Sequence, residues 1–144
     1  MIRALLKAIR TKVDADSGAT GVATAIAGRY YLVVQVDRTP GGGTTKYPFL
    51  VCSVITEAPQ AEFSDVYIER VLIQFSGFDN SDGNSPDTCA QVTGKVRALF
   101  DGASLDLTAD GYTTAACIRE GGVGPLRIDG AWQQTTDYMV VFST

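Results

Sequence analysis

The sequence contains no histidine among its 144 residues. Histidine is the commonest general base and the commonest metal ligand of proteins, so its absence removes any Ser–His or Cys–His nucleophilic pair. Carboxylate and tyrosine chemistry stay open, but the chain offers no paired carboxylates at a spacing that acid–base catalysis uses. We therefore expect a protein that is not an enzyme, with no cofactor and no catalytic metal.

Cysteine is also scarce. Cys52, Cys89 and Cys117 lie far apart, and no two of them have the close spacing of a metal site. The odd number argues against a framework of disulfides. We expect three small, buried, hydrophobic side chains.

Long apolar runs are absent. No run approaches the ~20 residues that a helix needs to cross a bilayer. The first ten residues mix charged with apolar side chains, which is unlike the apolar region of a secretory signal. We expect synthesis in the cytoplasm and no membrane partner.

Positive charge is concentrated near the start of the chain. Residues 1–13 hold Arg3, Lys7, Arg10 and Lys12 and no acidic residue, which leaves −8 on the remainder of a chain whose net charge is −4. An acidic protein of this kind is a poor ligand for nucleic acid, so we expect no direct binding of DNA or RNA. The basic stretch is either a solvated helix face or a surface for head-to-tail contact between copies.

Two segments have the periodicity of amphipathic helices. Apolar residues recur at three- and four-residue spacing in residues 2–15 and again in residues 86–100. Ser85 is suited to the N-cap of the second helix, and Gly102 to its end. The small residues of 19–28 fit a loop or a short helical turn.

Stretches rich in β-branched and aromatic residues predict strands over 30–36, 48–56, 66–76, 112–119 and 131–142. The polar break at 58–65 carries Pro59 and predicts a turn between the two middle strands. The order is α-β-β-β-α-β-β, with consecutive strands and separate helices. This pattern indicates one α+β domain over residues 1–144, an antiparallel (mixed at most) β-sheet packed by two α-helices.

The strand at 66–76 is apolar on both of its alternating faces. One face holds Tyr67, Val71, Ile73 and Phe75, and the other holds Val66, Ile68 and Leu72. A sheet with one wet face would alternate cleanly between apolar and polar residues. We expect both faces to be covered, one by the helices and part of the other by a partner subunit.

Two polar stretches resemble ligand sites only superficially. Residues 41–46 are rich in glycine and end in Lys46, but a strand follows instead of the helix that a phosphate-binding loop requires. We interpret them as a loop that contacts a partner. Asp79, Asp82 and Asp87 could ligate a cation, although they lack the spacing of an EF-hand. The simpler interpretation is a turn followed by a helix cap.

Aromatic side chains offer the remaining alternative. They could line a ligand pocket on a curved sheet, with Glu69 as a base; they are Tyr30, Tyr31, Tyr67, Tyr112, Trp132 and Tyr138. Packing in the core and at interfaces is the interpretation we favour, because a single acid without a defined partner is a weak sign of catalysis. Glu69 and Arg70 then form a polar stretch on a partly exposed strand.

Several segments together resemble one protein family. They are the basic N-terminal helix, Ala27-Gly28-Arg29-Tyr30-Tyr31, the glycine-rich gap before Tyr47-Pro48-Phe49-Leu50-Val51, residues 53–59, Ile73-Gln74-Phe75-Ser76-Gly77-Phe78, and residues 92–100 leading to Leu105-Asp106-Leu107. In these features the chain resembles the tail terminator or tail completion proteins of long-tailed bacteriophages and phage-like particles. The resemblance covers most of residues 1–107.

The resemblance implies a structural protein of the virion, without enzymatic activity. Such proteins form a ring, usually a hexamer, on the head-proximal end of the tail. The ring stops polymerisation of the tail tube and joins it to the head. The implied partners are further copies of the same chain, the tail tube protein and the head–tail connector protein, with assembly in the host cytoplasm. The alternatives are a small-ligand-binding or lyase-type α+β domain, or another tube or connector subunit.

The candidate contact residues come from three places. We expect subunit or tube contacts at Gly41, Gly42, Gly43, Thr44, Thr45, Lys46, Gln60, Glu62, Arg3, Lys7 and Arg10. A head-to-tail contact that closes by rotation makes a ring, so these residues are expected to link neighbouring copies.

Overall fold

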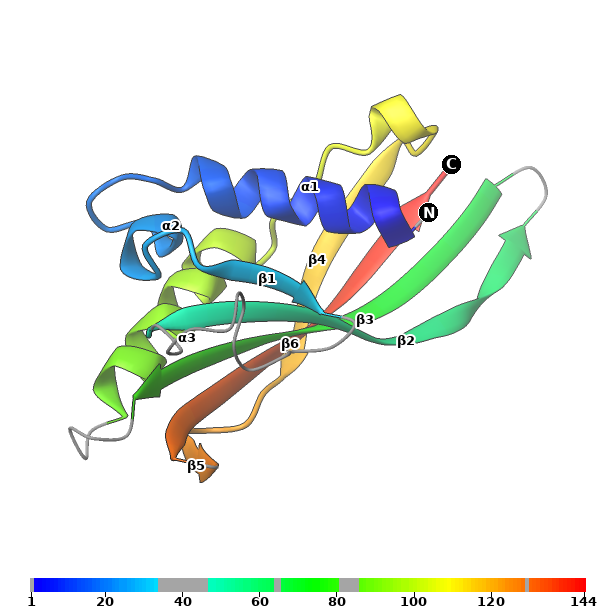
Figure 1. Ribbon diagram of the computed structural model, residues 1–144. Coiled ribbons are helices and arrows are strands. Elements are labelled where there is room, and N and C mark those ends of the chain that lie inside the picture. The colour runs from blue at the N-terminus through cyan, green and yellow to red at the C-terminus, as the bar shows by residue number, and fades with distance from the viewer. Residues whose placement is uncertain (1, 34–46, 64–65, 81–85, 129) are drawn as a thin grey trace.

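The computed structural model describes residues 2–33, 47–63, 66–80, 86–128 and 130–144. These residues form an α+β domain in which helices pack on a six-stranded sheet (Figure 1). The fold class expected from the sequence is confirmed. The sheet is mixed and has one strand more than the five expected.

The strand order in the sheet is β1-β2-β3-β6-β4, and β5 pairs with the first residues of β6. The elements are α1 (Ile2–Ala15), α2 (Val22–Ala25), β1 (Tyr30–Val33), β2 (Phe49–Phe63), β3 (Val66–Asn80), α3 (Asp87–Phe100), a 3-10 turn η3 (Thr108–Asp110), β4 (Thr114–Gly121), β5 (Leu126–Ile128) and β6 (Ala131–Ser143). The short α2 is the helical turn expected within 19–28. The three-residue β5 was not predicted, because so short a segment has no detectable periodicity.

One parallel pair makes the sheet mixed. β1 runs parallel to β2, with Tyr30 opposite Leu50, whereas the other pairings are antiparallel. The side chain of Arg29 fixes the start of this pair, because its Nε donates to the Pro48 carbonyl at 2.8 Å and its Nη2 to the Tyr47 carbonyl at 2.8 Å. The backbone N–H of Leu50 donates to the Arg29 carbonyl at 3.0 Å. Arg29 thus anchors the two chain segments side by side.

The predicted turn at 58–65 is wrong for most of its length. β2 continues through Pro59 to Phe63, and the register with β3 shifts between Ala58 and Ala61. A proline has no N–H to donate, so it is tolerated where a strand is irregular or lies at an edge. The first condition holds here, because the register is irregular at this point of β2.

The core lies between the helices and one face of the sheet. Leu5, Ile9 and Val13 of α1 are fully buried, as the stripe on residues 2–15 predicts. Phe100 of α3 packs on Phe75 of β3, with 4.8 Å between the two ring centres. Burying side chains of this size contributes roughly 1.5–3 kcal/mol each, so this layer holds the helices in place.

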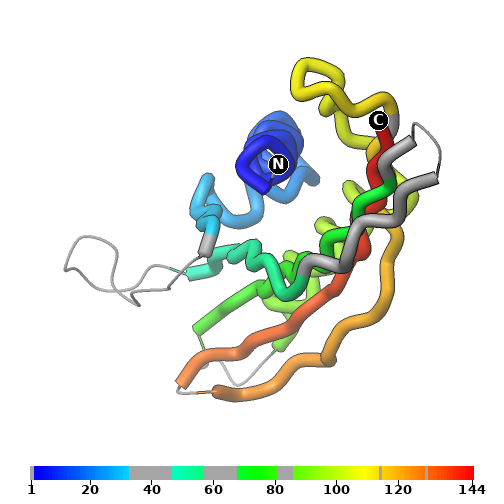
Figure 2. Tube along the Cα trace, turned by 90° about the vertical axis from the view of Figure 1, so that its right-hand side faces the viewer, coloured from blue at the N-terminus to red at the C-terminus, as the bar shows by residue number. Residues whose placement is uncertain are grey.

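The second face of the sheet carries no helix in the part of the chain that the structure describes (Figures 1 and 2). Leu72, Met139 and Ile118 lie in one row across β3, β6 and β4 on this face. Ile118 is 51% exposed, and Leu126 of β5 is 49% exposed. The expectation that both faces are covered therefore holds for one face within a single chain, and a partner subunit on the other stays a prediction.

Candidate functional site

Helix α1 positions the basic residues that the sequence singled out. Its apolar stripe is buried against the sheet, so Arg3, Lys7 and Arg10 lie on the exposed side of the helix. No described helix has the length and apolar character needed to span a membrane. α1 therefore presents its positive charges on the surface of the domain.

A groove runs between α1 and the end of β1, and we call it the basic groove. It has a volume of about 640 Å³ and is lined by Ile2, Arg3, Leu6, Lys7, Arg10 and Leu32. Among the described residues, the lining combines three apolar side chains with three basic ones and contains no acid. Such a surface fits a ligand that is apolar and negatively charged.

The three basic residues of this groove have different surroundings. Arg10 forms an ion pair with Asp14 at 3.4 Å, and its guanidinium lies 5.8 Å from the centre of the Tyr30 ring. Neither Arg3 nor Lys7 has an acidic side chain within ion-pair distance in the described part of the chain. These two charges are therefore available to an external partner.

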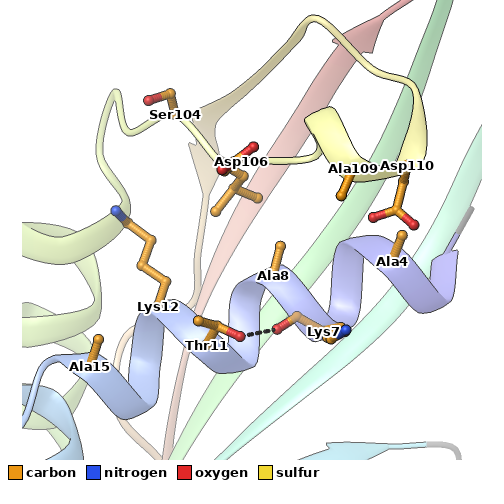
Figure 3. A pocket seen from close by; sticks show the side chains of 11 residues that line it. Ala4, Lys7, Ala8, Thr11, Lys12, Ala15, Ser104, Asp106, Ala109 and Asp110 are labelled. Carbon is orange, nitrogen blue, oxygen red and sulfur yellow. Dashed lines mark hydrogen bonds between the residues drawn. The ribbon is translucent and has the colours of Figure 1, made fainter.

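A second depression, which we call the charged cleft, lies on the other side of α1 (Figure 3). Its volume is about 450 Å³, and its lining residues are Ala4, Lys7, Ala8, Thr11, Lys12, Ala15, Ser104, Leu105, Asp106, Ala109 and Asp110. Asp106 accepts hydrogen bonds from the N–H and the hydroxyl of Thr108, at 3.1 and 2.6 Å, and these bonds lower the pKa of its carboxyl. Asp106 thus serves as the cap of a turn, which is a structural role.

Two of the aromatic residues, Tyr30 and Tyr138, belong to the core. Tyr30 is 2% exposed and Tyr138 is fully buried, and neither groove is lined by an aromatic side chain. Burial raises the pKa of both phenols, and Tyr138 donates to Asp101 at 2.6 Å. Glu69 is buried too, which corrects the expectation of a partly exposed polar stretch at that position. For Tyr30 and Tyr138, core packing is the interpretation that the structure supports.

The three cysteines are free and buried, as predicted. Desolvation raises the pKa of Cys52 to about 12, and that of Cys89 and Cys117 to about 11. A thiol with so high a pKa stays protonated at neutral pH and is a poor nucleophile. The cysteines therefore act as core residues.

The remaining predicted site residues are only partly placed. Gly41 to Lys46 lie outside the described residues, and so do Asp82 and the predicted N-cap Ser85. Gln60 and Glu62 belong to β2, whose backbone is described there. Asp79 is in β3 and Asp87 in the first turn of α3, which begins one residue later than predicted. The cation site stays an untested alternative.

Sequence reasoning missed Leu32 as part of the basic groove. Residues 30–33 are all apolar or aromatic, so the pattern does not reveal which side chain stays exposed. In the structure Tyr30 is buried under α1, whereas Leu32, two residues on, is 38% exposed beside Leu6 and Arg3. Leu32 lies beyond the part of β1 that α1 covers. Only the packing of α1 on the sheet shows where that cover ends.

Comparison with known proteins shows a likeness to solved structures but not to a known family. No family model matches the sequence, and no curated protein matches it. A solved chain from a structure described as the virion of a native gene transfer agent (GTA) particle has a similar fold, with a TM-score of 0.65 and 14% sequence identity. The alignment covers 93% of this chain and 90% of that chain. At this identity the likeness shows a shared fold over nearly the whole of both chains.

Proposed function

We propose that the protein is a non-enzymatic structural component of a phage-like virion, and specifically its tail terminator. In this role, copies of the chain form a ring, expected to be a hexamer, on the head-proximal end of the tail tube. The ring stops tube polymerisation and provides the surface that the head–tail connector binds.

The observation that carries the proposal is the fold shared with a chain of the GTA virion, over 93% of this chain. Because the alignment also covers 90% of the other chain, the likeness concerns a whole subunit and not a fragment. The resemblance of residues 1–107 to tail terminators adds the specific role. Virion subunits assemble through contacts between copies, and the surface of this chain has features suited to such contacts.

Two surface features support self-assembly. The basic groove presents Arg3 and Lys7 beside exposed apolar side chains. The face of the sheet opposite the helices exposes Ile118 and Leu126. Exposed apolar side chains on one face of a sheet fit a surface that a partner covers.

The test is a tube-length assay. The tail tube protein of the same particle is polymerised in the presence and absence of this protein, and tube lengths are measured by electron microscopy. We expect tubes that stop growing once the protein is added, with extra density at one end. Preformed capped tubes should not extend when fresh tube protein is supplied.

Two outcomes would contradict the proposal. Tubes that elongate equally with and without the protein would remove the terminator role. Long polymers of the protein alone would instead identify a tube subunit. The control is the same protein added after heat unfolding, which separates capping from a nonspecific effect on the tubes.

A further inference from the structure

The face of the sheet opposite the helices has an apolar row at its centre. Leu72 of β3 pairs with Met139 of β6, and Met139 pairs with Ile118 of β4. We call these three residues the apolar row. Val141 and Ala116 form a second apolar pair beside it. Ile118 is 51% exposed and Ala116 is exposed, so the row fits a surface that a partner hides from water.

Two residues of opposite charge lie on either side of the apolar row. Alternate residues of a strand share a face, so Arg70 and Gln74 lie on the same face of β3 as Leu72, one before it and one after it. Asp137 of β6 pairs with Gln74, and its Oδ1 accepts a hydrogen bond from the Gln74 Nε2 at 2.9 Å. The face is therefore positive on one side of the row and negative on the other.

These two charges are not balanced by neighbours in the described part of the chain. Neither Arg70 nor Asp137 lies within ion-pair distance of an oppositely charged side chain among the described residues. Arg70 is exposed and Asp137 is half-buried. The Gln74 amide is neutral, so it orients the Asp137 carboxylate without balancing its charge. Both charges are thus available to a group on a partner.

We propose that two copies of the free protein pack these faces against each other, about a twofold axis that runs along the apolar row. Packed sheets lie about 10 Å apart, a gap that side chains from both sheets fill together. The rotation reverses the direction of the strands and keeps β3 over β3. Arg70 of each copy then lies over the Gln74–Asp137 pair of the other, so the same ion pair forms twice.

The placement of the charges selects this axis. A twofold axis parallel to the strands would place Arg70 of one copy near Arg70 of the other, and like charges in an interface are unfavourable. The pair is isologous and stops at two copies, whereas the contacts of a ring are heterologous. The inference therefore goes beyond the proposed function, because it describes the free protein before it meets a tail tube.

Charge reversal tests the pairing. The single variants are Arg70→Glu and Asp137→Arg, and self-association is measured by sedimentation velocity over a range of protein concentrations at low salt. We expect the wild type to reach the mass of two copies and no more. Each single variant should associate at least about tenfold more weakly, because two like-charged pairs then face each other across the axis.

Restoration is the sharper outcome. The double variant with Arg70→Glu and Asp137→Arg exchanges the two charges, so its association should return toward that of the wild type. An equimolar mixture of the two single variants should form a mixed pair, because each charge then meets one of opposite sign. A double variant and a mixture that both stay monomeric would overturn the proposed ion pair.

A third variant tests the apolar row without changing the Gln74–Asp137 hydrogen bond. Ile118→Lys lies on an exposed part of β4 and should also weaken the pair at least about tenfold, because it places two charges at the buried centre. The matched controls are Arg3→Glu on α1 and Asp110→Arg on η3. Both residues are exposed on the helix side of the sheet, and both changes should leave the pair intact.

The outcomes separate this inference from the proposed function. A wild type that stays monomeric at every concentration overturns the pair, and so does a dimer that all three variants form equally well. Neither result bears on tube capping, which the tube-length assay measures separately. A larger closed particle that is insensitive to these variants would likewise show that copies meet through another surface. Thermal unfolding of each variant confirms that it is folded.

Discussion

Cys52 and Tyr30 are ionisable residues that lie in the core. Tyr30 of β1 and Cys52 of β2 are both almost fully buried, and burial raises the pKa of each. The folded protein therefore keeps both groups neutral. Since the unfolded chain exposes them to water, the two states bind different numbers of protons at high pH.

This difference predicts a loss of stability in alkali. Above pH 9, the ordinary pKa of the thiol, the unfolded state loses the Cys52 proton while the folded state holds it up to about pH 12. The free energy of unfolding should therefore fall as pH rises between these values, by about 1.4 kcal/mol per pH unit for each thiol ionised only in the unfolded chain. Urea unfolding at pH 7, 9 and 10.5 measures the slope.

The control for this prediction is Cys52→Ala. The variant lacks the group that ionises, so its free energy of unfolding should depend less steeply on pH between 9 and 12 than that of the wild type. Its stability at pH 7 is not the readout, because the substitution also changes packing. An unchanged slope would show that Cys52 is not protected from ionisation in the folded state.

Helix α3 and strand β3 show how two elements meet at close range. Gly77 of β3 lies under α3, and a Cβ at this position would come within 3.3 Å of Thr93 Cγ2 and 3.4 Å of Val92 Cγ1. The Cys89 thiol donates to the Gly77 carbonyl at 3.0 Å. A side chain at Gly77 would therefore be tightly packed against α3.

A pair of glycine substitutions tests this packing. Gly77→Ala should lower the free energy of unfolding by about 1–3 kcal/mol, because the added methyl overpacks the α3–β3 contact. Gly94→Ala should raise it by roughly 0.5–1 kcal/mol, since Gly94 lies in the exposed interior of α3 with no atom within 4 Å of a new Cβ. Chemical denaturation measures both. Shifts of the same sign would contradict the packing described here.

The elements differ in how far the sequence predicts them. Helix α1 is predicted to the residue, because its apolar stripe repeats over four turns and Asp14 and Asp16 follow it. The turn predicted at 58–65 is wrong because, by local propensity, Pro59 indicates a break in the strand. In the structure β2 continues past Pro59, because it pairs with β3 on both sides of that residue. Pairing between distant segments decides whether such a stretch forms a strand, and the local sequence does not show that pairing.

At the scale of the whole molecule, the sequence predicts the charge separation but not its geometry. The positive charge of residues 1–13 is plain from composition. The basic groove depends on Leu32 of β1 lying beside α1. This feature follows from how distant segments pack. The sequence therefore names the basic residues, but it does not show which apolar side chain lies beside them.

The central claim is that copies of this chain close into a ring on the end of a tail tube. The most direct measurement is the mass of the purified protein by light scattering across a range of concentrations, with electron microscopy of the same sample mixed with tail tubes. The account predicts a mass that stops at a fixed number of copies, or a monomer that forms a ring on tube ends. A monomer that ignores tubes, or a polymer that grows without limit, would contradict it.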